Sequence, residues 1–134
     1  MKDYSNYLTR NRVLLVDDEP DIVYLVKTGL EGNGLKVDAY TDPLLALQNF
    51  KSDLYFLLAL DIKMPKMDGL ELFNRIEKKD SNVRVCFFSA SEHLTSSFKN
   101  LFQSSPDKFL FVLKPISIPK MTKQIIHFLS SSYG

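Results

Sequence analysis

Four mainly apolar segments of the chain each end in side chains suited to phosphoryl chemistry. The segments are residues 13–16, 55–60, 83–88 and 109–113. The side chains at their ends are, in the same order, Asp17 with Asp18, then Asp61, Ser89 and Lys114. To catalyse phosphoryl transfer, a protein mainly has to position the reacting groups and neutralise their charge. Carboxylates, a hydroxyl and an ammonium group can together meet both demands.

The acids are expected to lie close together, and such a cluster has a definite electrostatic consequence. Open α/β sheets place their ligands and their chemistry at the carboxyl ends of parallel strands. Carboxylates a few ångströms apart raise one another's pKa, so they favour either protonation or a bound hard cation with oxygen ligands. Asp17, Asp18 and Asp61 are therefore candidates for binding a hard divalent cation, with Lys114 as a positive charge at the end of another strand.

The elements that must position these residues follow from the periodicity of the chain. From Arg12 onward, apolar runs alternate with segments in which apolar residues recur at helical spacing. Thr41-Asp42-Pro43 is typical of a helix start, and Ser117 is expected to cap the last helix. The expected inward residues, helix by helix, are Ile22, Leu25, Val26, Gly29 and Leu30; Leu44, Leu47 and Phe50; Leu72, Phe73 and Ile76; Leu94, Phe98, Leu101 and Phe102; and Ile118, Met121, Ile125 and Phe128.

This alternation predicts an α/β fold with a doubly wound, five-stranded parallel sheet. Strands that are apolar throughout are covered on both faces, which requires helices on both sides of the sheet. Right-handed crossovers favour the flavodoxin-like strand order 2-1-3-4-5, with five helices. Residues 35–40 alternate more weakly than the other strands and are expected nearer an edge. We expect residues 1–11 to form an N-terminal tail and residues 12–132 to form the domain.

Length and composition exclude several classes of function. A chain of 134 residues with a net charge of +1 is one domain without an electrostatic case for binding nucleic acid or an anionic membrane. No apolar stretch approaches the roughly 20 residues that span a bilayer. The single cysteine, Cys86, lies in an apolar run and cannot form an internal disulfide. We expect a cytoplasmic protein.

The motifs, taken jointly, point to a family. The pattern is Asp17-Asp18, then Asp61 followed by Met64-Pro65 and Asp68-Gly69, then Ser89-Ala90, then Lys114-Pro115. In this order, and each after an apolar strand, these residues resemble a response-regulator receiver domain of two-component signalling, of the kind found in single-domain chemotaxis-type regulators. The resemblance covers roughly residues 11–132.

The resemblance implies a role for each acid in metal binding. Asp61 would be the phosphoacceptor and also a ligand of Mg²⁺. Asp18 would bind the metal directly, Asp17 would bind it through water, and the backbone carbonyl of Lys63 would complete the protein's share of ligands.

The resemblance also implies how the phosphoryl group is held and how it is sensed. Ser89 would hydrogen-bond the phosphoryl group, Lys114 would pair with it, and Phe111 would be the aromatic switch residue. The implied phosphodonor is a partner histidine kinase or a small molecule. The implied output is a downstream protein that binds the face made by the fourth helix, fifth strand and fifth helix. A homodimer linked to phosphorylation is a further option, and the domain would catalyse only its own phosphorylation and dephosphorylation.

Other functions remain open at this point. A haloacid-dehalogenase-type phosphatase also uses a strand-end aspartate with Mg²⁺, but it needs a second aspartate where this chain has Lys63. A flavodoxin-like cofactor binder would place phosphate beside Asp17-Asp18-Glu19, which would repel it. A receiver-shaped interaction domain that is never phosphorylated is a third reading. Alternatively, these acids could merely cap the first helix. The sequence is compatible with a complete single-domain regulator and with a fragment of a longer one.

Overall fold

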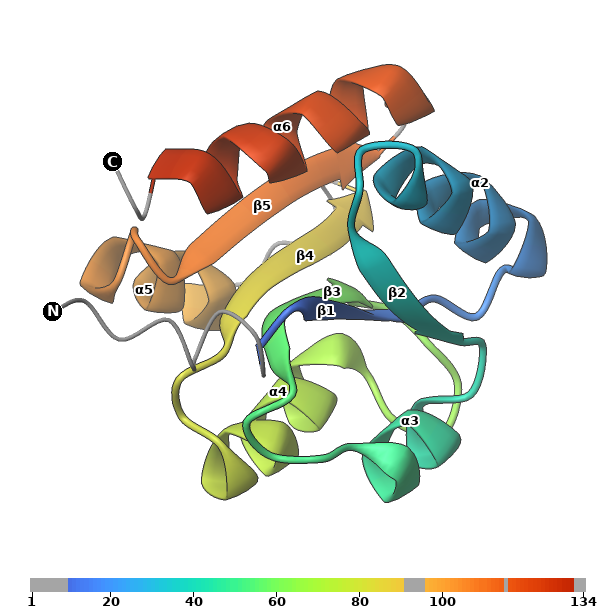
Figure 1. The fold of residues 1–134 in the computed structure, drawn as a ribbon. Helices are drawn as coiled ribbons and strands as arrows, with labels where there is room; N and C mark the ends of the chain where they lie inside the picture. The colour runs from blue at the N-terminus through green and yellow to red at the C-terminus, as the bar shows by residue number, and fades with distance from the viewer. Residues whose placement is uncertain (1–9, 91–95, 115, 132–134) are drawn as a thin grey trace, which may run out of the picture.

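The computed structural model describes residues 10–90, 96–114 and 116–131, and Figure 1 shows their arrangement. Three parts of the sequence-based predictions lie outside these residues. They are most of the expected N-terminal tail, the inward position expected for Leu94, and Pro115 of the Lys-Pro motif.

Five parallel strands form one sheet. They are β1 (Arg12–Val16), β2 (Lys36–Tyr40), β3 (Tyr55–Asp61), β4 (Arg84–Ala90) and β5 (Phe109–Lys114). Their order across the sheet is β2-β1-β3-β4-β5. The predicted fold class and strand order are confirmed, and β2 lies at an edge as expected.

Helices cover both faces of the sheet. The described residues form α2 (Pro20–Glu31), α3 (Pro43–Asn49), α4 (Gly69–Lys79), α5 (Ser96–Ser104) and α6 (Ile118–Ser131). In Figure 1, α2 and α6 lie together on one side of the strands, and α3, α4 and α5 lie on the other. None of the helices in the described ranges combines the length and the apolar character that a membrane crossing requires.

The two layers of helices enclose two apolar cores, one on each face of the sheet. Leu58 and Leu60 of β3 face the core beneath α3, α4 and α5, whereas Leu57 and Ala59 face the core beneath α2 and α6. Successive side chains of a strand point to opposite faces, so a strand buried on both sides must be apolar at every position. This burial explains why β3 lacks alternation in the sequence.

Three of the predicted inward residues, one each in α2, α3 and α5, are wrong. Phe102 of α5 has 39% of its surface exposed. Leu25 and Leu44 each have 45% of their surface exposed. In α2 the buried stripe runs through Val23 and Val26, and Leu25 is turned away from Val26 by about 100° around the helix. In α3 the small residue Ala46 is buried instead. Leu25 and Leu44 are apolar but lie beside the buried stripes of their helices, and apolar character alone does not distinguish them from the buried residues.

The ends of the helices explain the loops beside the candidate site. Asp42 caps α3, with its Oδ1 accepting a hydrogen bond from the backbone N–H of Leu44 at 2.9 Å. Asp68 caps α4 in the same way, with its Oδ1 2.8 Å from the nitrogen of Glu71. By contrast, α2 begins after Glu19 without a side-chain cap. The acids that precede α2 are therefore not capping it.

Candidate metal and phosphoryl site

The parallel register brings the ends of four strands to one edge of the sheet. Val16, the last residue of β1, pairs with Leu60 of β3, and the next residue of β3, Asp61, pairs with Phe88 of β4. Lys114, the last residue of β5, pairs with Ala90 at the end of β4. The residues that the sequence predicts for the site therefore follow or end adjacent strands on the same side of the molecule.

Lys114 joins the acids. Its Nζ lies 3.1 Å from Oδ2 of Asp17 and 3.5 Å from Oδ1 of Asp61. Glu19 also contributes, with its Oε1 3.8 Å from the same nitrogen. Burial alone would lower the pKa of Lys114, but the charges of Asp17 and Asp61 outweigh burial and raise it. The lysine therefore stays charged and neutralises part of the cluster.

Asp61 is the acid whose ionisation the site disfavours most clearly. It is 6% exposed, and burial together with the negative charge of Asp17 raises its pKa to about 7, although Lys114 opposes this rise. Without further positive charge, a substantial fraction of this carboxyl group is protonated near neutral pH. A divalent cation at the site would favour the carboxylate, which is the nucleophilic form.

Asp17, Asp18 and Glu19 form a group of oxygen donors suited to such a cation. One carboxylate oxygen from each lies within 4.8 Å of the others. Asp17 is fully buried, and its Oδ1 accepts a hydrogen bond from the backbone N–H of Glu19 at 3.0 Å. Burial raises the pKa of Asp17 despite this bond and the proximity of Lys114. An all-oxygen donor set of carboxylates fits Mg²⁺, which takes hard oxygen ligands.

Glu19 is a residue that the sequence reasoning did not assign to the site. It directly follows the acid pair, but the family resemblance implies no role for it. Its side chain is 62% exposed and reaches toward Lys114 from the start of α2. The run of three acids was the available signal.

Gly69 is a second residue whose role the sequence did not reveal. A Cβ at this position would collide with the backbone carbonyl of Asp61 and lie 3.0 Å from the Cα of Ile62. The N–H of Gly69 donates to the carbonyl of Ile62 at 2.7 Å. The start of α4 therefore packs directly on the backbone of the candidate nucleophile. Only glycine leaves room for this contact.

Ser89 and Phe111 lie beyond the acids, toward β5 and α5. Ser89 is 1% exposed, and its hydroxyl donates to the carbonyl of Ala90 at 2.8 Å. Phe111 is half-buried, and its ring centroid lies 5.6 Å from that of Phe87 and 5.6 Å from that of Phe102. A rotation of the serine side chain would free its hydroxyl for another acceptor. The phenylalanine occupies an aromatic cluster beneath α5.

Lys63 follows Asp61 by two residues, in the loop between β3 and α4, and it is exposed. The same loop is anchored on its inner side by the N–H of Ile62, which donates to the carbonyl of Phe88 at 3.0 Å. Lys63 is therefore held near the acids by its backbone while its side chain stays in solvent.

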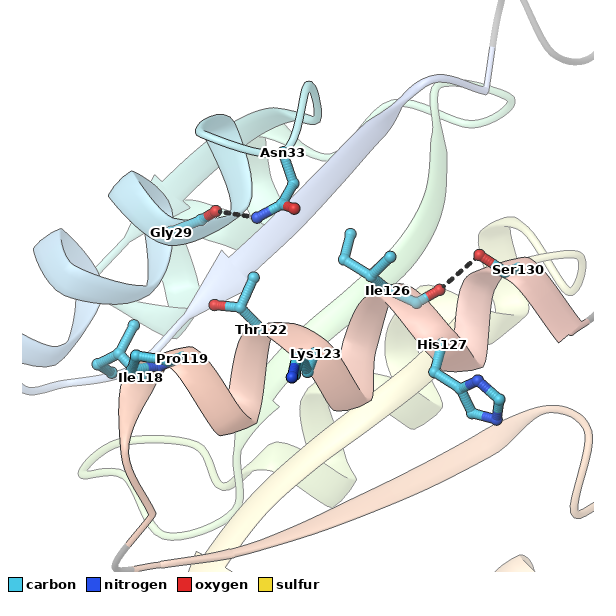
Figure 2. Close-up of a pocket in the computed structure, with 9 residues that line it drawn as sticks. All are labelled: Gly29, Asn33, Ile118, Pro119, Thr122, Lys123, Ile126, His127 and Ser130. Atoms are coloured by element: carbon cyan, nitrogen blue, oxygen red, sulfur yellow. Dashed lines mark hydrogen bonds between the residues drawn. The ribbon is translucent and has the colours of Figure 1, made fainter.

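A groove of about 630 Å³ lies elsewhere in the fold, between α2 and α6. Figure 2 shows its lining, in which the side chain of Asn33 donates to the carbonyl of Gly29 and the hydroxyl of Ser130 donates to the carbonyl of Ile126. None of the lining residues carries a carboxylate. The groove shares no residue with the acid site.

Comparison with known proteins agrees with this geometry. The family model described as "Response regulator receiver domain" matches residues 13–126. The chain belongs to the response regulator receiver domain family. This membership does not favour the alternatives of a phosphatase and of a receiver-shaped domain that is never phosphorylated. Receiver domains as a class interact with histidine kinases and bind Mg²⁺ through an acidic pocket.

Curated relatives of this receiver domain are transcriptional regulators. It is 30% identical over 123 residues to the transcriptional regulatory protein TctD of Salmonella typhimurium, which covers 92% of this chain and 54% of TctD. It is 32% identical over 114 residues to TrcR of Mycobacterium tuberculosis, which covers 85% of this chain and 43% of TrcR. The receiver domain thus spans about half the length of these relatives.

Solved structures share the fold. The signal receiver domain of a LuxO repressor protein from Vibrio parahaemolyticus matches with a TM-score of 0.73 and 26% identity, covering 92% of this chain and 93% of that one. A CheY-like receiver domain protein from Methanospirillum hungatei matches with a TM-score of 0.72 and 22% identity, covering 91% and 95% respectively.

Proposed function

We propose that this receiver domain is phosphorylated on Asp61, with Mg²⁺ as cofactor, and that the modification controls binding to a partner protein. The proposed donor is a sensor histidine kinase or a small phosphorylated molecule, and the proposed domain comprises residues 12–132. The observation that carries the proposal is the 3.5 Å contact between Lys114 Nζ and Asp61 Oδ1 beside a cluster of carboxylates.

The proposed reaction is a phosphoryl transfer to a carboxylate oxygen. An oxygen of Asp61 forms a bond to phosphorus while the bond from phosphorus to the donor's nitrogen or oxygen breaks, and the leaving atom keeps the electron pair. The acyl phosphate carries about two negative charges. Lys114 is positioned to pair with these charges, and Ser89 can donate a hydrogen bond once its hydroxyl leaves the carbonyl of Ala90.

Asp18, Asp61 and the carbonyl of Lys63 would hold the metal, with Asp17 acting through water. Bound there, Mg²⁺ supplies positive charge that offsets the phosphoryl oxygens and favours the ionised form of Asp61. The role of Asp17 differs from that of Asp18, because Asp17 is fully buried and already occupied by Lys114 and the N–H of Glu19. This division supports a direct contact for Asp18 and an indirect one for Asp17.

The first test is chemical labelling. Incubation with acetyl phosphate and Mg²⁺ is expected to add one phosphoryl group to the wild type and none to Asp61→Asn, which keeps the side-chain shape but loses the nucleophile. Intact-mass spectrometry measures both. Asp53→Asn, at an exposed acid before the opposite end of β3, is the matched control and should label as the wild type does. Equal labelling of wild type and Asp61→Asn would remove Asp61 from this role.

The proposed output surface is the face made by α5, β5 and α6. A cleft of about 260 Å³ on this face is lined by residues of α5 and β5 that include Phe102 and Phe111. Phe102 and Leu113 are exposed there, at 39% and 48%. The neighbouring apolar and aromatic side chains suit a protein partner, and the ring of Phe111 links this cleft to the buried strand β4 through Phe87.

Phosphorylation is expected to reach this face through Ser89 and Phe111. A switch requires an element with two arrangements whose balance the new charge alters. We expect beryllofluoride, which mimics the phosphoryl group, to shift NMR signals of Phe111 and of α5 as well as those of the acids. Leu45, exposed on α3, should not respond. Shifts confined to the acid cluster would contradict the proposed relay.

A further inference from the structure

A small cleft adjoins the acid site on the side of α3. Its volume is about 200 Å³, and it is lined by Asp18, Thr41, Asp42, Pro43, Pro65 and Lys66. Asp18 and Asp42 are the two carboxylates in this lining, and Lys66 is its single cation. The proposed metal ligand Asp18 thus shares one cavity with an ion pair that has no part in the phosphoryl chemistry described above.

The ion pair spans the cleft between two loops. Nζ of Lys66, in the loop before α4, lies 3.1 Å from Oδ2 of Asp42, in the loop before α3. The other carboxylate oxygen of Asp42 accepts the N–H of Leu44 at 2.9 Å. The carboxylate of Asp42 is therefore fixed at the start of α3. In the ion pair, it is the side chain of Lys66 that is held by Asp42.

The backbone of Lys66 is also fixed, which leaves only its side chain free to move. Lys66 has φ of +73°, and the N–H of Met67 donates to the carbonyl of Pro65 at 2.8 Å, closing a three-residue turn. The side chain is 58% exposed. With the backbone held in this turn, the position of the ammonium group is decided by the carboxylate that it meets.

We propose that Asp42 is a positioning residue that holds the ammonium group of Lys66 away from Asp18 and so keeps Asp18 free to bind Mg²⁺. This inference rests on the proposed function, in which Asp18 is a metal ligand. If the carboxylate of Asp42 is removed, Asp18 is the remaining acid in the lining of the cleft. The freed ammonium pairs with it and competes with the metal for the same oxygens.

Two substitutions separate this idea from other roles of the pair. Asp42→Asn removes the charge but preserves the helix cap, because asparagine caps helices as well as aspartate does. Lys66→Asn removes the ammonium, and asparagine tolerates a positive φ better than most residues. Neither change is expected to disturb the fold, and thermal melts of each variant verify this.

The measurement is the Mg²⁺ affinity of the full chain, obtained by calorimetric titration and by NMR shifts of the acid cluster. Asp42→Asn is expected to weaken binding by roughly threefold, in the range of a single competing surface ion pair. Lys66→Asn should bind at least as tightly as the wild type. The double variant Asp42→Asn/Lys66→Asn should regain the affinity of Lys66→Asn, because the competing cation is gone.

Three results would overturn the inference alone. If the double variant binds as weakly as Asp42→Asn, the charge of Asp42 acts by itself. If Lys66→Asn also weakens Mg²⁺ binding, the ion pair acts by holding the two loops together. An unchanged affinity in Asp42→Asn shows that no competition occurs. Asp18→Ala distinguishes failure of the inference from failure of the proposed function. If the wild type does not bind Mg²⁺, or if Asp18→Ala binds it as tightly as the wild type, both the proposed function and this inference are overturned.

Discussion

Lys63 follows the candidate phosphoacceptor Asp61 by two residues, and its side chain is exposed. Its carbonyl is the proposed metal ligand, so its side chain is free for another role. A long cationic side chain over the mouth of the site can contact phosphoryl oxygens or obstruct the in-line approach of water. Either effect would lengthen the life of the acyl phosphate.

We expect Lys63→Ala to retain Mg²⁺ binding and to speed spontaneous dephosphorylation by roughly threefold, a small change in barrier height. The decay of phosphorylated protein, followed by intact-mass spectrometry after removal of the donor, measures the effect. Lys51→Ala, at an exposed lysine between α3 and β3, is the control and should decay as the wild type does. A decay rate at or below that of the wild type would refute this role for Lys63 without affecting Asp61.

The start of α4 is coupled to the end of β3. Gly69, the first residue of α4, packs against the backbone of Asp61 and donates its N–H to Ile62. Asp68 caps the same helix. The position of the candidate nucleophile therefore depends on where α4 begins. A side chain at position 69 would push the helix and the strand apart.

We expect Gly69→Ala to lower the free energy of unfolding by about 2 kcal/mol, because the new methyl group overpacks a backbone contact. It should also slow labelling of Asp61, since the strand end is displaced. Urea denaturation and phosphorylation rates measure the two effects. Gly34→Asn is the control, because nothing lies within 4 Å of a Cβ there and asparagine tolerates its positive φ of +88°. Unfolding free energies that are equal in the wild type and Gly69→Ala would contradict the steric argument.

An ion-pair cluster anchors the end of the sheet opposite the acid site. Asp80 follows α4, and its two oxygens lie 2.8 and 3.0 Å from the guanidinium of Arg10. The same carboxylate accepts the backbone N–H groups of Asp53 and Asn82. Burial works to raise the pKa of Asp80, but these hydrogen bonds outweigh burial and lower it. The segment before β1 is thereby tied to the starts of β3 and β4.

We expect Asp80→Asn to lower the free energy of unfolding at pH 7 by about 3 kcal/mol, because it removes the buried carboxylate and leaves the largely buried Arg10 with only the exposed Asp53 as a charged partner. A lowered pKa means that the stabilisation is complete above the unfolded pKa of about 4 and is lost as the pH falls through the folded value. The difference between wild type and variant should therefore shrink at pH 3. Urea denaturation at both pH values measures it.

The control for this prediction is Asp53→Asn. The side chain of Asp53 is 79% exposed although it also contacts Arg10, and its φ of +67° suits asparagine. We expect little change in stability. A loss in Asp80→Asn that is the same at pH 3 and pH 7 would show that the cluster acts through packing rather than charge.

The sequence alone determined the fold class, the strand order and the set of residues at the strand ends. Strands buried on both faces are apolar at every position, and polar residues such as Asp61 and Lys114 interrupt them only where the strands end. Parallel strands share one carboxyl edge, so local patterns were enough to predict that these residues gather there. The same patterns predicted the caps at Asp42 and Ser117, whose oxygens accept the N–H groups of Leu44 and Lys120.

The tertiary structure decided the contacts that join elements distant in the chain. Leu25 lies in solvent because Val23 and Val26 face the sheet. Position 69 must be glycine because the backbone of Asp61 and Ile62 lies against it. Lys66 forms its ion pair with Asp42 across a cleft. Periodicity records which residues share a face of one helix or strand, but it holds no information on how closely two elements approach. Those distances are set by the packing of the whole molecule. The geometry of the site depends on them, and the sequence alone supplies only its candidate residues.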